Sequence, residues 1–145
     1  MAVPPRVSLV TLGVNDVARS TLFYAALGWP LSSASVPGKV SFFKTAGGLL
    51  AIWSSEALAA DAGLPASQVA IPGGAALAMN LDSRERVDSA LVQAAAAGAR
   101  ILVPGRETDW GGYNGYFADP DGHLWEVAFN PFWPIGRDGR PTLPE

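Results

Sequence analysis

Hydrophobic and polar residues alternate along several short stretches of this chain, with the period of two that is typical of β-strands. Between these stretches, apolar residues recur every three or four positions, which is the spacing of helices that bury one face. In the first half, the pattern predicts the order β-α-β-β-β. The expected strands are 7–14, 31–35, 39–44 and 49–53, and the expected helix is 17–27. One or two helical turns are expected at 55–62.

The second half of the chain repeats this plan. Its expected helix starts at a cap on Asp82 or Ser83 and ends at Gly98. Val14-Asn15-Asp16 aligns with the segment Leu81-Asp82-Ser83, which indicates an internal duplication. The expected strands are 75–81, 101–103, 110–118 and 123–129, and the last two form a hairpin across Asp119-Pro120-Asp121-Gly122.

The duplication predicts one α+β domain built from two β-α-β-β-β modules. A chain of 145 residues has the usual length of a single domain. We expect the modules at about 6–54 and 75–130, a linker at 55–74 and a tail at 131–145. Each sheet can cover one face with its own helix. The other faces are expected to form a curved mixed sheet around a shared cavity.

Composition narrows the chemistry that such a cavity can hold. The chain has no cysteine and one histidine, His123, which excludes disulfides, thiolate zinc sites and any site needing two histidines from one chain. A net charge of −3 leaves no basic face for nucleic acid. No apolar run is long enough to span a membrane, and the start lacks the pattern of a signal peptide. We therefore expect a cytoplasmic protein that binds neither nucleic acid nor membrane.

Two sequence strings carry a family resemblance. They are VTLGVNDVARSTLFYAALGWP at 10–30 and FADPDGHLWEVA at 117–128. Together with the duplicated plan, they resemble the vicinal oxygen chelate superfamily, which includes glyoxalase I, extradiol dioxygenases, fosfomycin-resistance enzymes and bleomycin-resistance proteins. The resemblance implies a glyoxalase-like fold with a small-molecule cavity. Because members are often dimers, it also implies a homodimer.

The resemblance further implies where a metal would be held. The family's ligand positions fall on Leu9, near Ala51, on Ala76 and on Glu126. Catalytic metal sites typically use about three protein ligands, and only Glu126 among these residues carries a donor atom. We therefore expect no metal and no other cofactor.

Strand alternation predicts which side chains face the cavity. It places Glu126 and Tyr116 there as the candidate catalytic pair, and it directs His123 to the opposite face, where we expect solvent exposure. The candidate ligand-binding residues are Trp110, Asn114, Trp53, Thr11 and Asn80. A lining of aromatic and small residues with few polar groups and one carboxylate is typical of a small-molecule pocket.

Three functions remain open at this point. We favour a metal-free protein of the bleomycin-resistance type that holds an aromatic or hydrophobic ligand. The alternative is an enzyme of the lyase or isomerase type, in which Glu126 is a general base and Tyr116 or Asn114 donates a hydrogen bond. A third reading is a metal enzyme of the glyoxalase or dioxygenase type, with Glu126 as the remaining ligand.

Overall fold

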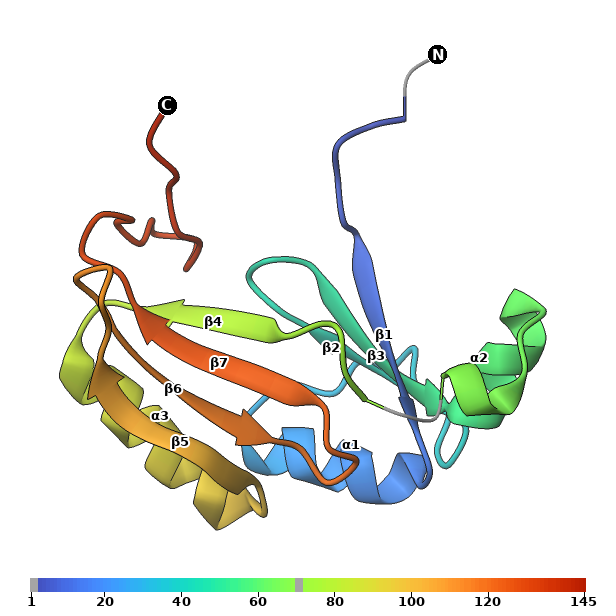
Figure 1. The fold of residues 1–145 in the computed structure, drawn as a ribbon. Coiled ribbons are helices and arrows are strands. Elements are labelled where there is room, and N and C mark those ends of the chain that lie inside the picture. The colour runs from blue at the N-terminus through green and yellow to red at the C-terminus, as the bar shows by residue number, and fades with distance from the viewer. Residues whose placement is uncertain (1–2, 70–71) are drawn as a thin grey trace.

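The computed structural model describes residues 3–69 and 72–145. The strands and helices fold into two halves that lie side by side (Figure 1). The elements are β1 (Leu9–Val14), α1 (Val17–Ala26), β2 (Val40–Lys44), β3 (Leu49–Ser54), α2 (Ser55–Ala62), a short 3-10 helix (Ala66–Gln68), β4 (Leu77–Leu81), α3 (Arg84–Ala97), β5 (Arg100–Glu107), β6 (Tyr113–Ala118) and β7 (Leu124–Phe129). None of the helices in this described part is long and apolar enough to cross a lipid bilayer.

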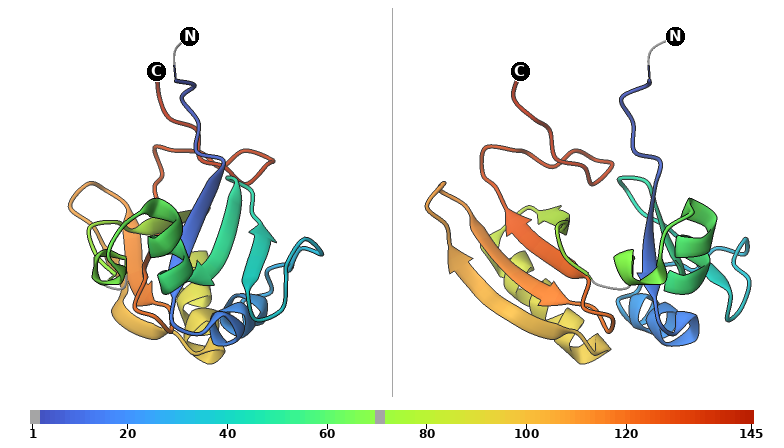
Figure 2. Two further views of the ribbon diagram at one scale, coloured as in Figure 1. Left: turned by 90° about the vertical axis from the view of Figure 1, so that its right-hand side faces the viewer. Right: turned by 45° about the vertical axis from the view of Figure 1, so that its right-hand side comes forward.

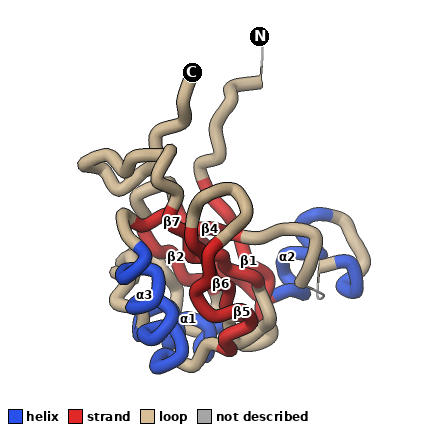
Figure 3. Tube along the Cα trace, turned by 60° about the vertical axis from the view of Figure 1, so that its left-hand side comes forward, coloured by secondary structure: helices blue, strands red, loops and turns tan. Residues whose placement is uncertain are grey.

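The strands form two separate mixed sheets. The first sheet has the order β1-β3-β2, and the second has the order β4-β7-β6-β5. In each sheet the strand before the long helix is parallel to the last strand of that half, whereas the other neighbours are antiparallel. Helices α1 and α3 lie on one side of the strands, and α2 lies apart from them (Figure 3). The predicted α+β class is thus confirmed, although the strands form two separate sheets and not the one curved sheet that was expected.

The strand expected at 31–35 is reduced to a single bridge between Leu31 and Phe43. Serine side chains supply the reason. Ser35 Oγ accepts a hydrogen bond from the backbone N–H of Phe42 at 2.9 Å, in the place where a neighbouring strand would offer its carbonyl. Ser32 Oγ accepts from the backbone of Ala34 and closes a local turn. Short polar side chains of this kind compete with strand pairing.

Strand β5 is longer than the expected 101–103, because a bulge carries it past Pro104 and Gly105. The pairing resumes where Arg106 meets Asn114. Proline donates no hydrogen bond to a ladder and occurs in strands mainly at edges or bulges. This extension brings Arg106 onto the second sheet.

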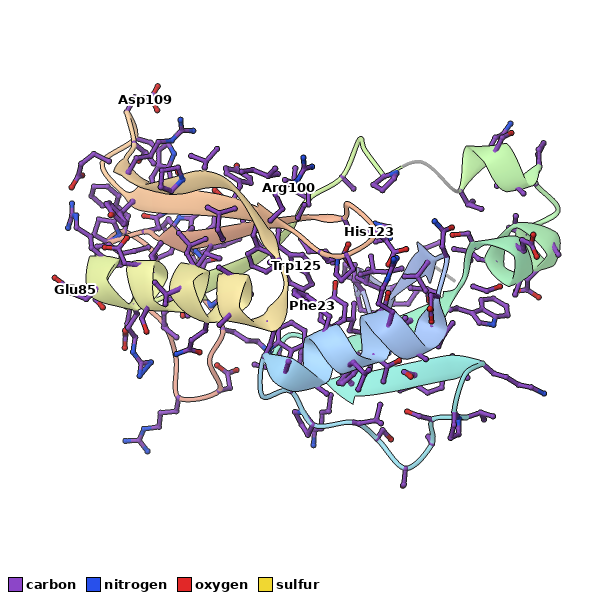
Figure 4. All side chains as sticks on the ribbon, turned by 90° about the horizontal axis from the view of Figure 1, so that it is seen from below. Phe23, Glu85, Arg100, Asp109, His123 and Trp125 are labelled. Carbon is purple, nitrogen blue, oxygen red and sulfur yellow. The ribbon has the colours of Figure 1, made fainter. Side chains whose placement is uncertain are left out.

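Aromatic side chains fill the core where the two halves meet. Tyr24 of α1 is fully buried, and its ring centroid lies 6.1 Å from that of Trp125 on β7. Trp125 stacks on Phe117 with an angle of 9° between the ring planes. Phe23 lies in the same region, where α1 reaches the second sheet (Figure 4). The halves therefore share one apolar core through α1.

The turn before β7 ties the second half to the first. Asp121, at this turn, accepts hydrogen bonds from Ser20 Oγ at 2.6 Å and from the backbone N–H of Asn15 at 2.9 Å. His123 does not face solvent as expected, because it is half-buried and its Nε2 lies 2.7 Å from the carbonyl oxygen of Gly13. Figure 4 shows His123 beside the first half of the chain. These polar contacts fix how the sheets sit relative to one another.

Candidate functional site

Two rows of side chains cross the same face of the second sheet. Strand register sets the rows, because paired residues on neighbouring strands point to the same side. One row runs Arg106, Asn114, Ala128 and Asn80. The next row contains Tyr116, Glu126 and Ala78. We call this surface the open face, because helix α3 packs on the other side of the sheet (Figure 2).

A single hydrogen bond organises the centre of the open face. Asn114 Nδ2 donates to Glu126 Oε2 at 2.8 Å. A carboxylate only accepts hydrogen bonds, so the amide must turn its NH2 group toward Glu126. The Asn114 oxygen is then left buried, with no hydrogen-bond partner among the described residues. Such an unsatisfied buried acceptor costs about 1–3 kcal/mol, and a donor from a ligand would relieve that cost.

Tyr116 lies directly across the strand pair from Glu126. Partial burial raises the pKa of the Tyr116 phenol, the negative charge of Glu126 raises it further, and Arg106 lowers it. The phenol therefore keeps its proton around neutral pH and serves as a hydrogen-bond donor. Glu126 is half-buried, so a ligand on the open face can reach both groups.

Trp110 folds back over Gly112 at the edge of this face. A Cβ atom on Gly112 would overlap the Trp110 ring and would lie 2.6 Å from the carbonyl oxygen of Phe129. Only glycine therefore leaves room for the indole in this position. Trp110 remains 43% exposed, which leaves ring surface for a ligand. Phe132 of the tail lies close to Gly111 beside it.

A hollow of about 310 Å3 lies beside Asn114 and Trp110, and neither Glu126 nor Tyr116 is among its lining residues. We call it the Asn114 hollow; its lining residues are Arg106, Glu107, Thr108, Asp109, Trp110 and Asn114. Figure 4 places Asp109 at the tip of the β5–β6 loop. Sequence reasoning missed Arg106 because the expected strand stopped at residue 103. The Pro104-Gly105 pair is the signal that could have indicated a bulge and a continued strand.

The structure does not gather all seven candidate residues in one place. Tyr116, Glu126 and Asn114 share the open face, with Trp110 at its edge. Thr11 and Trp53 belong to the first sheet, and Asn80 lies at the far end of its row. Helix α2 packs on the face that Thr11 and Trp53 share, because Ser55 and Leu58 approach Gly13 there.

A larger hollow, of about 550 Å3, is lined by both sheets. We call it the inter-sheet groove. Asn80 lines it, whereas Glu126, Tyr116 and Trp110 do not. The cavity expected between the sheets therefore does not contain the expected catalytic pair, and it shares no lining residue with the Asn114 hollow.

The residues at the family's metal positions do not fit a metal. In the structure Ala78, and not Ala76, is the β4 residue paired with Glu126, and alanine at either position offers no donor. Leu9 and Ala51 lie on the other sheet and offer none. Within residues 3–69 and 72–145, His, Asp and Glu side chains nowhere gather in a group of three able to hold a metal ion.

Comparisons with known proteins agree with this fold. A glyoxalase-related enzyme from Fulvimarina pelagi is 38% identical with a TM-score of 0.88, and the match covers 97% of this chain and 99% of that one. A lactoylglutathione lyase from Agrobacterium tumefaciens is 23% identical with a TM-score of 0.69, and the match covers 90% of this chain and 97% of that one. That second likeness concerns the fold alone.

A glyoxalase/bleomycin resistance protein/dioxygenase family enzyme from Burkholderia phytofirmans is 22% identical with a TM-score of 0.73, over 86% of this chain and 98% of that one. A search of curated proteins found no match. The sequence profile of one superfamily matches residues 6–127, which is most of the chain. This chain therefore belongs to the Glyoxalase/Bleomycin resistance protein/Dioxygenase superfamily.

Proposed function

We propose that the chain is a metal-free small-molecule-binding protein that holds a planar ligand on the open face of its second sheet. The observation that carries the proposal is the buried, unpartnered oxygen of Asn114 beside Glu126. Both groups accept hydrogen bonds, so the ligand they favour donates them through N–H or O–H groups. Trp110 offers an exposed ring on which an aromatic body can stack.

Charge around the Asn114 hollow refines the class of ligand. Glu107, Asp109 and Glu126 are acidic and Arg106 is basic. Arg84 already forms an ion pair with Glu107 at 2.8 Å. The charges that remain are more negative than positive, which favours a neutral or cationic hydrogen-bond donor over an anion as the ligand. An aromatic amide, amine or amidine satisfies these requirements.

A second candidate function is catalysis on the same face. The protonated Tyr116 phenol across from the Glu126 carboxylate supports a general base and a hydrogen-bond donor, which is sufficient for proton transfer in an isomerase or lyase. The 38% identical relative is described as a glyoxalase-related enzyme, which also supports this candidate. Proton transfer between these groups requires no metal.

We also propose that the protein works as a homodimer. Phe132 and Leu143 in the tail are 67% and 61% exposed, so a partner that covered them would bury apolar surface. Phe132 lies next to Gly111, so a partner bound there would border the Trp110 loop. A partner subunit at this position would close one side of the Asn114 hollow.

Native mass spectrometry of freshly purified protein tests these proposals together. We expect a dimer mass, a copurified organic ligand and no bound metal in the wild type, and loss of the ligand in Glu126→Gln. Glutamine keeps the shape of the side chain and removes its charge. A ligand retained equally by both proteins would place binding elsewhere. Turnover of the copurified molecule by the wild type alone would favour the catalytic candidate.

A further inference from the structure

Arg84, the first residue of helix α3, binds the end of strand β5. Its Nε donates to Glu107 Oε1 at 2.8 Å, and its terminal nitrogen Nη2 donates to Glu107 Oε2 at 3.1 Å. A pair of hydrogen bonds of this kind fixes the direction of the carboxylate as well as its distance. Figure 4 shows the start of α3, marked by Glu85, at the same end of the second half as Asp109 in the β5–β6 loop.

The guanidinium of Arg84 also lies over two aromatic rings. Its Cζ atom lies 6.0 Å from the centroid of the Tyr113 ring and 5.5 Å from that of the Phe129 ring. A guanidinium within about 6 Å of a ring centroid is attracted to the face of the ring. Strand register places Glu107, Tyr113 and Phe129 in one row across β5, β6 and β7. Arg84 therefore contacts every member of this row.

A second residue of α3 contacts the same row. Asp88 Oδ1, one helical turn after Arg84, accepts a 2.8 Å hydrogen bond from the Tyr113 hydroxyl. Gly105 in the bulge of β5 lies beside this bond, because a Cβ atom there would overlap Asp88 Oδ1 and would lie 2.6 Å from the Tyr113 hydroxyl oxygen. A larger residue at position 105 would displace one of the two partners. The bulge thus admits the contact between α3 and Tyr113.

The strand residues that α3 contacts are chain neighbours of residues that line the Asn114 hollow. Glu107 follows Arg106, and Tyr113 precedes Asn114. Successive residues of a strand point to opposite faces of the sheet. The row that Arg84 contacts therefore lies directly behind the row that contains Arg106 and Asn114 on the open face.

The same two strand residues flank the loop 108–112, which carries Trp110. Within this loop, Thr108 Oγ1 accepts a hydrogen bond from the backbone N–H of Gly112 at 2.9 Å. The backbone N–H of Thr108 donates to the carbonyl oxygen of Gly112 at 3.0 Å. Because the loop is closed on itself in this way, its orientation depends on how its two ends are held.

Arg84 gains little for the stability of its helix or of the fold. A cation in the first turn of a helix is unfavourable, because that end of the helix dipole is positive. The side chains of Arg84 and Glu107 are 44% and 67% exposed, and exposed ion pairs contribute little to stability. What the pair does is set the direction of the groups that it joins.

We propose that Arg84 is a positioning residue for the open face, and that it keeps Trp110 and Asn114 in the geometry that receives the ligand. It acts through the sheet, since α3 packs on the side away from the open face. This inference rests on the function proposed above, but its effect on Trp110 can be measured without any ligand.

The test removes the ion pair without changing the net charge. Arg84→Gln combined with Glu107→Gln removes both charges together. Asp82→Asn combined with Arg86→Gln is the matched control, because Arg86 of the same helix pairs at 3.6 Å with Asp82 and not with a strand. Fluorine NMR of protein labelled with 5-fluorotryptophan is the measurement, and Trp110→Phe identifies the Trp110 resonance. We expect this resonance to shift in the first double variant and to stay in place in the control.

Calorimetric titration with benzamidine is the second measurement. The wild type should bind about fivefold more tightly than the first double variant, because a loop that must be ordered on binding costs affinity. The control should bind like the wild type, and all three proteins should unfold at nearly the same temperature.

The possible outcomes separate this inference from the function on which it rests. An unmoved Trp110 resonance, an equal shift in the control, or an unchanged affinity despite a shifted resonance would overturn the proposal. A large fall in the unfolding temperature of the first double variant alone would also overturn it, because Arg84 would then stabilise the whole fold. If the resonance shifts as expected but the wild type binds no benzamidine, the proposed function fails and the positioning by Arg84 stands.

Discussion

The hydroxyl of Tyr24 donates a 2.7 Å hydrogen bond to Asp119 Oδ2, and both residues are buried. The same hydroxyl accepts a 3.0 Å hydrogen bond from the indole nitrogen of Trp125. The other oxygen of Asp119 accepts from the backbone N–H groups of Asp121 and His123. The phenol therefore joins α1 in the first half to the turn that precedes β7, and so it determines how the open face is oriented.

Tyr24→Phe should lower the free energy of unfolding by about 1–3 kcal/mol, because it removes a hydrogen bond to a buried carboxylate. Chemical denaturation at pH 7 measures this change. Tyr113→Phe is the control, since the Tyr113 hydroxyl bonds Asp88 at the surface and should matter much less. Equal losses in the two variants would contradict the importance assigned to the buried contact.

The same residue predicts a pH dependence. Burial and the charge of Asp119 raise the pKa of Tyr24 above its ordinary value of 10. The stability that the Tyr24 phenol contributes is fully present below about pH 10. It is lost at higher pH, because the unfolded chain then releases the phenol proton while the folded chain retains it. Stability of the wild type should therefore fall more steeply above pH 10 than that of Tyr24→Phe, by up to about 1.4 kcal/mol per pH unit. Parallel slopes would contradict this assignment.

Asp121→Ala should destabilise the fold by at least about 1.5–3 kcal/mol, since hydrogen bonds to a charged group contribute about that much. The side chain of Asp121 is only 4% exposed beside Arg19, and it accepts a hydrogen bond from Ser20. Asp82→Ala is the matched control, because its ion pair with Arg86 is exposed on both sides and contributes at most about 1 kcal/mol. The difference in denaturation midpoint between the two variants is the measurement.

Gly112→Ala should displace the Trp110 ring and weaken binding on the open face. The added methyl group has no room beside the indole and the Phe129 carbonyl. Tryptophan fluorescence should shift even without ligand, because the Trp110 ring would move away from its position over residue 112. Gly38→Ala serves as a control, since a Cβ there meets nothing, although its positive φ costs some stability. An unchanged affinity with a displaced Trp110 would exclude Trp110 from the site.

Elemental analysis should find no zinc, iron, nickel or manganese held in proportion to the chain. The reason is the chemistry of the donor positions, because of Leu9, Ala51, Ala78 and Glu126 only Glu126 carries a donor atom. A chelator should leave the unfolding temperature unchanged. About one metal ion per chain that resists dialysis would contradict the proposed metal-free function.

Local signals predicted most of the fold. Ser83, one of the two expected caps, caps α3 with its side-chain oxygen 3.2 Å from a backbone N–H group, and Asp16 caps α1 in the same way at 3.0 Å. The period-two pattern correctly placed Glu126 and Asn114 on one face. The failures came from contacts distant in sequence. A turn residue such as His123 looks exposed until the Gly13 carbonyl is brought against it, and the bulge that positions Arg106 has only weak local signals.

The most direct test of the proposed site is calorimetric titration with benzamidine, a planar amidine that can donate to Glu126 and Asn114 and stack on Trp110. The wild type should bind it about tenfold more tightly than Glu126→Gln, because a hydrogen bond to a charged group contributes about 1.5–3 kcal/mol and about 1.4 kcal/mol is a factor of ten. Trp110→Ala should lose a similar factor. Identical affinities in all three folded proteins, or no binding to any of them, would contradict a ligand site on the open face.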